Sequence, residues 1–148
     1  MKMDRNLLLE SANRLAHTST QSADEYYRKS DQLIALMNTT MLKRPDVENL
    51  VGQNNIDMMQ DNHANHVRFI ASILKYPNPE VLVETVLWVF QAYRSHGFTT
   101  NYWAAQLNTW MDVLKQVLTD ESYKEVYPYY EWMQTNIPLF VKISGEKA

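Results

Sequence analysis

The side chains best placed to do chemistry are three polar groups that fall on one face of a predicted helix. At about 100° per residue, this face carries Asn62, His63 and His66. The apolar Met59 shares it, whereas Asp61 points nearly opposite. A buried polar group without a partner costs about 1–3 kcal/mol. The pattern therefore predicts either partners inside the protein (backbone carbonyls, one another or water) or a ligand that carries N–H groups, carbonyls and carboxylates.

Metal binding and catalysis are poorly supported by the motifs. His63 and His66 share a face at i,i+3 spacing, but no third ligand and no HExxH pattern accompanies them. The chain has no GxSxG, P-loop or dinucleotide-binding fingerprint. It also contains no cysteine, which excludes disulfides, thiolate metal sites and cysteine nucleophiles. We therefore expect no metal and no enzymatic activity.

Composition limits the class of protein. A chain of 148 residues is the size of one domain, and 45% apolar residues supply a core. A net charge of −3 without a basic run argues against nucleic acid as a partner. No apolar stretch approaches the ~18–20 residues of a membrane span. The first residues lack the apolar core of a signal peptide, so we expect a cytoplasmic protein.

The elements that position these groups are predicted to be helices throughout. Apolar residues recur every three or four positions, and only three glycines and five prolines interrupt the chain. The helix near Val81 to Phe90 is apolar all round, which is typical of burial. Pro128 and Pro138 are expected to kink the last helix. The predicted helices are residues 3–16, 21–43, a short one from 45 to about 52, 56–76, 78–95, one from about 100 past 117, and 119–143. Seven or eight helices in this length favour an all-α, globin-like stack over a four-helix bundle.

Two segments resemble a known family. His66-Val67-Arg68-Phe69-Ile70 resembles the Tyr-Leu-Arg-Met-Val segment of the pigment-lining helix of phycobiliproteins. Arg94 to Leu107, with its corner Phe98-Thr99-Thr100-Asn101 and then Tyr102-Trp103, resembles the stretch that follows. The resemblance covers about a third of the chain. It implies a phycobiliprotein-type helical stack with two extra N-terminal helices, in one domain over residues 1–148, with 1–19 as an N-terminal extension suited to dimerisation.

Family roles transfer only where positions match. In this register the family's pigment-attaching cysteine falls on Met59, and its pyrrole-binding aspartate falls on Asn62. The arginine that contacts a propionate falls on Asp61, and a tyrosine falls on His66. A shift of one residue would instead place Asp61 at the aspartate position. Without the cysteine, the resemblance implies a pigment held without a thioether.

The chain is more similar to the non-photosynthetic relatives of phycobiliproteins, the bilin-associated globins, because they also carry a histidine before the Val/Leu-Arg-Phe/Tyr segment. That resemblance implies non-covalent binding of a bilin, such as biliverdin or a reduced derivative, for storage, delivery or sensing. The bilin is expected to lie near Tyr102 and Trp103 and to bond Asn62, His63 and His66, with Arg68 or Arg94 pairing with its propionates. A homodimer and bilin-synthesis enzymes are the implied partners.

Two alternatives remain open. Haem binding is one, because His66 and His96 are 30 residues apart, near the separation of globin haem ligands, although Gly97 follows His96 at once. The other is a cofactor-free signalling or assembly module whose pocket is filled by Met59, Trp103 and their neighbours. Dimerisation through the N-terminal helices is also plausible, since Leu7, Leu8 and Leu15 must be buried somewhere.

Overall fold

Helices form nearly all of the computed structural model, which describes residues 2–145. Within this range nine α-helices follow one another with no strand, so the all-α prediction is confirmed. The helices are α1 (Lys2–Asn13), α2 (Thr20–Arg28), α3 (Ser30–Leu42), α4 (Val47–Val51), α5 (Ile56–Lys75), α6 (Pro79–Ser95), α7 (Thr100–Val117), α8 (Asp120–Thr135) and α9 (Ile137–Gly145). None of the described helices is long and apolar enough to cross a membrane.

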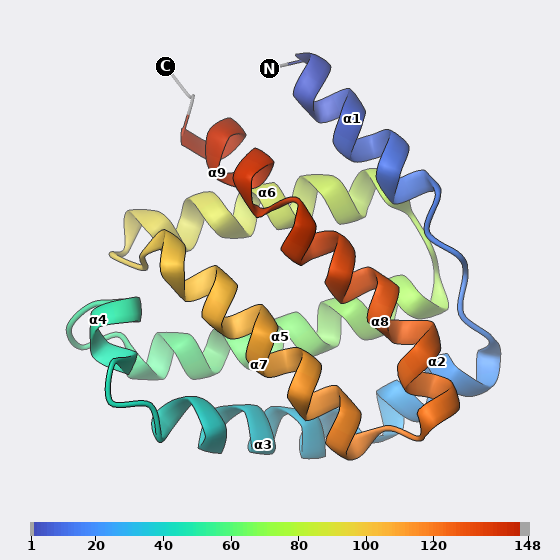
Figure 1. Cartoon of the computed structure of the whole chain (residues 1–148), viewed down its shortest axis with the longest axis horizontal. Helices are drawn as coiled ribbons and strands as arrows, with labels where there is room; N and C mark the ends of the chain where they lie inside the picture. The colour runs from blue at the N-terminus through green and yellow to red at the C-terminus, as the bar shows by residue number, and fades with distance from the viewer. Residues whose placement is uncertain (1, 146–148) are drawn as a thin grey trace.

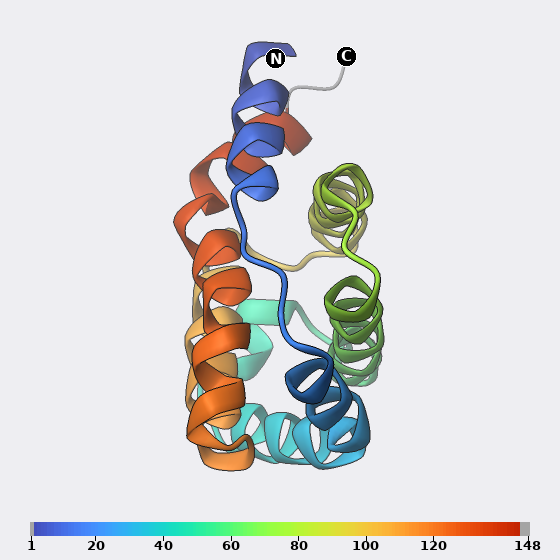
Figure 2. The same ribbon diagram turned by 90° about the vertical axis from the view of Figure 1, so that its right-hand side faces the viewer.

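The long helices lie in two layers (Figure 2). Helices α5 and α6 form one layer, and α7, α8 and α9 form the other. At one end, α2 packs against α5 and α8, while α3 packs against α5 and α7. At the opposite end, α1 lies beside α6 and α9 (Figure 1). Every described helix contributes to one hydrophobic core, whose largest fully buried side chains include Trp110, Tyr26 and Tyr102.

Helix α6 is held mainly by the two terminal helices. It packs chiefly against α1 and α9 rather than against its neighbour α5. Arg5 of α1 forms an ion pair with Glu84 of α6 at 2.6 Å, although both side chains are largely exposed and such pairs contribute little. Near the other end of α6, Arg94 Nη1 donates to Ser144 Oγ of α9 at 2.8 Å. Helices α5 and α6 therefore do not pack closely against each other, which leaves room for a cavity between them.

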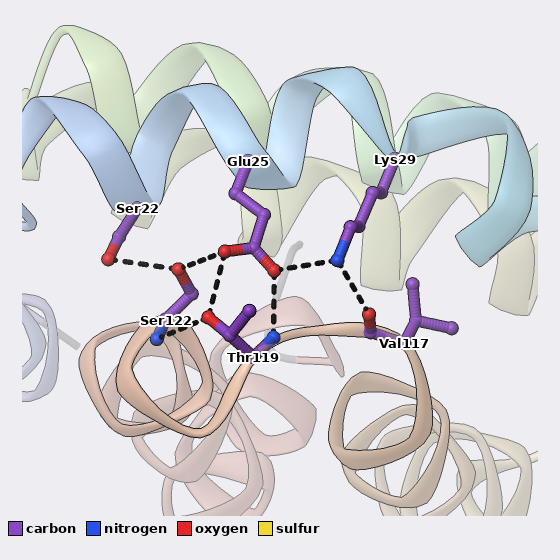
Figure 3. A network of polar contacts seen from close by, with 6 residues as sticks. All are labelled: Ser22, Glu25, Lys29, Val117, Thr119 and Ser122. Carbon is purple, nitrogen blue, oxygen red and sulfur yellow. Dashed lines mark hydrogen bonds and ion pairs between the residues drawn. The ribbon is translucent and has the colours of Figure 1, made fainter.

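The helix predicted over residues 21–43 is divided at Lys29, where the backbone leaves helical geometry (φ −95°, ψ 13°). Ser30 Oγ donates to the carbonyl oxygens of Tyr26 and Tyr27, and such local bonds compete with the helix ladder. Lys29 Nζ donates to Val117 O at 3.0 Å and forms an ion pair with Glu25 at 2.9 Å (Figure 3). The prediction of one continuous helix was therefore wrong.

The helix predicted over residues 119–143 is also two helices. Pro128 lies inside α8, which continues through it to Thr135. The division comes at Asn136, whose Nδ2 donates to Trp132 O at 2.8 Å. Pro138 is the second residue of α9, where a missing N–H has no intrahelical partner to lose. Pro138 therefore stands at a helix start rather than at a kink.

The N-terminal extension contains the helix predicted there. The described part of residues 1–19 holds one helix, α1, which overlaps the helix predicted over residues 3–16. Leu8 and Ala12 are buried in the chain's own core, and Leu15 packs against it. Leu7 alone of the three leucines remains half exposed. A second copy of the chain is therefore not needed to bury Leu8 and Leu15.

The expectation that α6 is buried all round was also wrong. Val81 is 44% exposed and Trp88 is 66% exposed. The opposite side of the helix carries the buried Leu82, Val86 and Phe90. Helix α6 therefore has one face in the core and a second face with large apolar side chains at the surface.

Candidate functional site

An apolar cavity of about 250 Å³ lies between α5, α6 and α7, with Met133 of α8 at one wall. Each of the three long helices contributes residues at three- or four-residue spacing, as one face of a helix must. They are Asn62, Asn65, His66, Phe69 and Ile70 of α5, Thr85, Val86, Trp88, Val89, Phe90 and Tyr93 of α6, and Trp103, Gln106 and Leu107 of α7. None of these lining residues is an acid, a lysine or an arginine.

Asn62 is fixed by two side chains of α7. Its Oδ1 accepts hydrogen bonds from Tyr102 Oη and from Gln106 Nε2, both at 2.7 Å. Gln106 Nε2 also lies 3.3 Å from Tyr102 Oη, and all three residues are buried. Burial raises the pKa of Tyr102 well above its ordinary value, so its phenol stays protonated. The amide oxygen of Asn62 is thus occupied from within the protein.

His66 lines the cavity and closes a buried chain of hydrogen bonds. Its Nε2 lies 2.9 Å from Tyr130 Oη, which lies 2.6 Å from Tyr26 Oη. The imidazole stacks on Trp110, with ring centroids 5.0 Å apart. His66 keeps some accessible surface because it faces the cavity, yet burial, with a smaller effect of nearby His63, lowers its pKa to about 3. The ring is therefore neutral at neutral pH.

His63 lies behind the cavity wall. Its Nδ1 forms a 2.6 Å hydrogen bond with Asn38 Oδ1 of α3, and its ring meets Trp110 edge to face. Burial lowers the pKa of His63 to about 3, so it too is uncharged at neutral pH. A neutral ring that donates from Nδ1 leaves Nε2 as an acceptor, and this atom has no partner. His63 therefore supports the site without lining it.

Trp103 is the buried indole at the cavity. It is 3% exposed, and Phe90 stacks on its ring with centroids 4.3 Å apart. Tyr93 and Tyr102 meet it edge on. Its Nε1–H has no hydrogen-bond partner. Because Phe90 covers one face of the ring, that face is not available for stacking by a ligand.

The other predicted site residues lie elsewhere. Asp61 and Arg68 are on exposed positions of α5, and Arg68 borders a separate open groove of about 630 Å³ against α2. Met59 is fully buried but does not line the cavity. Arg94 is engaged with α9, and the exposed His96 follows the end of α6. The structure thus brings Asn62, His66 and Trp103 to the cavity, has Tyr102 and His63 directly against them, and leaves the rest outside.

Sequence reasoning missed the α6 wall and Gln106. The α6 positions Val86, Val89 and Phe90 have the spacing of ordinary core, so nothing in their pattern distinguishes a cavity wall from packed interior. Gln106 carried a usable signal, because it is a polar residue within the apolar stripe from Trp103 to Trp110. An amide at such a position requires a partner, which here is Asn62.

Comparison of the chain with protein-family models, with characterised proteins and with solved structures finds no match. Among residues 2–145 no group of three or more histidine, aspartate or glutamate side chains is arranged to hold a metal ion. The cavity and its hydrogen bonds are therefore the basis for a functional proposal.

Proposed function

We propose that this protein binds an open-chain tetrapyrrole, such as biliverdin or a reduced derivative, without a covalent bond and without catalysing a reaction on it. The observation that carries the proposal is that one apolar cavity is lined by Asn62, His66 and Trp103. The resemblance to bilin-associated globins assigns these positions to the pigment. A neutral asparagine and a neutral histidine suit a bilin in its uncharged form.

The helix packing supports a globin-like, phycobiliprotein-type stack. Helix α2 packs against α5 and α8, α3 packs against α5 and α7, and α7 packs against α8. The cavity opens between α5 and α6, in the half of the chain that carries the resemblance. Globins place their cofactor in a pocket among helices packed pairwise in this manner.

The volume of the cavity limits how much of such a ligand it can enclose. Pockets that bury a drug-sized ligand have volumes of about 300–1,000 Å³, and this cavity has about 250 Å³. It is large enough for one end of the pigment, while the remaining rings extend past Asn65 and Trp88. Because no lining residue carries a full charge, the propionates remain outside in water.

Haem binding fits this geometry less well. The α6 side of the cavity presents Val86, Val89, Phe90 and Tyr93 but no histidine. His96 is exposed and does not line the cavity, and His66 Nε2 is engaged by Tyr130. Iron coordination would require this bond to break.

A cofactor-free interaction module is the second candidate, and one observation favours it. Asn62, His63 and His66 each have a hydrogen-bond partner within the chain. The requirement for a polar ligand that their burial suggested is thus largely met by Asn38, Tyr130 and neighbouring side chains. This candidate predicts that no tetrapyrrole is retained.

Biliverdin added to the purified protein tests the proposal. We expect a sharpened, red-shifted absorption band that survives desalting. Val86→Phe fills the cavity and should abolish this band, whereas Val81→Phe, on the exposed face of the same helix, should leave it unchanged. A spectrum identical to free pigment, or equal retention by both variants, would contradict the proposal. Haem added in parallel should give no shifted Soret band.

A further inference from the structure

Two side-chain amides, those of Asn62 and Gln106, meet in the wall of the cavity and are called the amide pair below. Gln106 Nε2 donates to Asn62 Oδ1 at 2.7 Å, and Tyr102 Oη donates to the same oxygen. One polar atom of each amide is thus bonded within the chain. The other two atoms, Asn62 Nδ2 and Gln106 Oε1, form no hydrogen bond within the part of the chain that the structure describes.

These two unbonded atoms are reachable from the cavity. Asn62 is 4% exposed and Gln106 is 2% exposed, and both residues line the cavity. Among residues 2–145, the unpartnered side-chain atoms that are sealed from any solvent are ring nitrogens, those of His63, Trp103 and Trp110. Asn62 Nδ2 and Gln106 Oε1 are not sealed in this way, so the small surface that each amide retains includes its unbonded atom.

The other polar side chains of the cavity wall are less deeply buried. Asn65 is exposed, and Thr85 and Tyr93 are half-buried, so water can bond the groups that the chain leaves unbonded. His66 is half-buried too, and its Nε2 is bonded to Tyr130. Buried polar groups are nearly always paired in folded proteins. The amide pair is therefore the part of the described wall with the strongest requirement for a partner from a ligand.

The two unbonded atoms have opposite hydrogen-bonding roles. Asn62 Nδ2 can only donate, and Gln106 Oε1 can only accept. Each is attached to the same carbon as one atom of the 2.7 Å bond, so one small ring can reach both. Turning both amides over would exchange the two roles and still leave one donor and one acceptor. The matching ligand group is a cis-amide, which carries a C=O and an N–H on adjacent ring atoms.

We propose that Asn62 and Gln106 form a lactam-binding subsite of the cavity, in which Asn62 Nδ2 donates to the ring carbonyl and Gln106 Oε1 accepts from the ring N–H. The inference rests on the proposed function for the molecule that carries the lactam. Each end ring of an open-chain tetrapyrrole such as biliverdin is a lactam. Haem has no lactam, so this subsite selects open-chain pigments over closed ones.

The lactam 2-quinolone and the lactone coumarin are matched probes, because they share a fused two-ring frame and a carbonyl and differ in N–H against O. The quantity to measure is the ratio of their dissociation constants, Kd for coumarin over Kd for 2-quinolone. Gln106→Met should lower this ratio roughly tenfold, because it removes the acceptor that only the lactam N–H uses. Taking a ratio cancels the general effect of the substitution on apolar binding.

Thr109→Val is the matched control for this ratio. Thr109 is a buried polar residue of the same helix, its hydroxyl donates to Ala105 O, and it does not line the cavity. The ratio should therefore stay at its wild-type value, with circular dichroism showing that both variants are folded. An unchanged ratio in folded Gln106→Met, or an equal fall in Thr109→Val, would overturn the inference.

A second measurement uses the unaltered protein. The side-chain NH₂ signals of Asn62 in a ¹H–¹⁵N spectrum, assigned by sequential connectivity, should move downfield with 2-quinolone. They should not do so with naphthalene, which has the same frame without the lactam. No downfield movement with 2-quinolone, the same movement with naphthalene, or no binding of 2-quinolone would overturn the inference.

Biliverdin separates this inference from the proposed function. Lactam discrimination that depends on Gln106, with no retention of biliverdin, would defeat the proposed function and leave the lactam-binding subsite intact. Biliverdin held equally by wild type and Gln106→Met would defeat the role of the subsite in pigment binding and leave the proposed function intact.

Discussion

Glu25 of α2 holds Thr119, the residue that caps the start of α8, by two hydrogen bonds to one carboxylate (Figure 3). The backbone N–H of Thr119 donates to Oε2 at 2.7 Å, and its hydroxyl donates to Oε1 at 2.8 Å. Ser122 Oγ adds a third bond at 2.7 Å, and Lys29 forms the ion pair. A carboxylate at a helix N-terminus also interacts favourably with the positive end of the helix dipole. One acid thus joins helices that are far apart in the chain.

This contact predicts a loss of stability in acid. Burial of Glu25 opposes its charged form, but the hydrogen bonds from Ser122, Thr119 and Lys29 outweigh it and lower the pKa from 4.5 to about 2. The folded protein therefore binds the carboxyl proton of Glu25 less tightly than the unfolded chain does. The contribution of this carboxylate to the unfolding free energy is full above pH 4.5 and disappears as the pH falls towards 2. It amounts to about 3 kcal/mol of unfolding free energy.

The measurement is urea unfolding of wild type and Glu25→Gln between pH 7 and pH 2. We expect the variant to be less stable at pH 7, with the difference shrinking below pH 4.5 as the wild-type carboxylate is protonated. The difference in unfolding free energy between the two proteins cancels the effect of the other acids, which titrate in both. A difference that stays constant with pH would show that the charge of Glu25 does not matter.

The buried His63 and the partly buried His66 predict a second, less acidic transition. Burial lowers the pKa of His63 and of His66 from 6.5 to about 3. The unfolded chain therefore binds protons that the folded protein does not bind. The contribution of these histidines to the unfolding free energy is full above pH 6.5 and falls as the pH drops towards 3. Each histidine contributes a slope of about 1.4 kcal/mol per pH unit in this window.

His66→Phe tests this slope, because a phenyl ring can still stack on Trp110. We expect the unfolding free energy of the variant to fall less steeply with decreasing pH than that of the wild type. Between pH 6.5 and 5 the slope should be smaller by about 1.4 kcal/mol per pH unit, the contribution of one histidine. Loss of the bond to Tyr130 should lower stability by a constant amount at every pH. Parallel curves for the two proteins would mean that His66 binds its proton as readily in the folded protein as in the unfolded chain.

Substitutions at Leu7 and Leu8 distinguish an effect on folding from an effect on self-association. Leu8 is fully buried in the chain's own core, so Leu8→Ala should cost about 2–5 kcal/mol of unfolding free energy. Leu7 is 50% exposed on the same helix, and Leu7→Ala should change stability by less than about 0.5 kcal/mol. If the N-terminal extension forms a homodimer, Leu7→Glu should convert it to a monomer in size-exclusion chromatography and leave the melting of each chain nearly unchanged.

Helical periodicity was sufficient to predict the all-α class and the approximate ends of α5, α6 and α7. It failed at Lys29, where the division accompanies contacts with Glu25 and Val117 rather than glycine or proline, and at Asn136, where the helix ends before Pro138 instead of bending at it. Helix periodicity placed Asn62 and His66 on one face, and the family resemblance placed Trp103 beside them, whereas the partners of these residues did not follow from either. Tyr130 and Tyr26 are 64 and 40 positions from His66, and no local pattern indicates that Tyr130 bonds His66 or that Tyr26 bonds Tyr130. The exposed side of α6 was missed because apolar composition alone does not distinguish a core position from the mouth of a cavity.

Trp88 at this mouth provides a further prediction. Its side chain lines the cavity while 66% exposed, so it contributes little to the fold, and under the proposed function it packs against the part of the bilin outside the cavity. Trp88→Ala should therefore change the unfolding free energy by less than about 0.5 kcal/mol and weaken retention of biliverdin roughly tenfold, since loss of a large aromatic contact removes 1 kcal/mol or more. Tyr76→Ala is the matched control, because Tyr76 is 68% exposed and lies away from the cavity. Equal weakening by both substitutions, or none by Trp88→Ala, would place the ligand away from this end of the cavity.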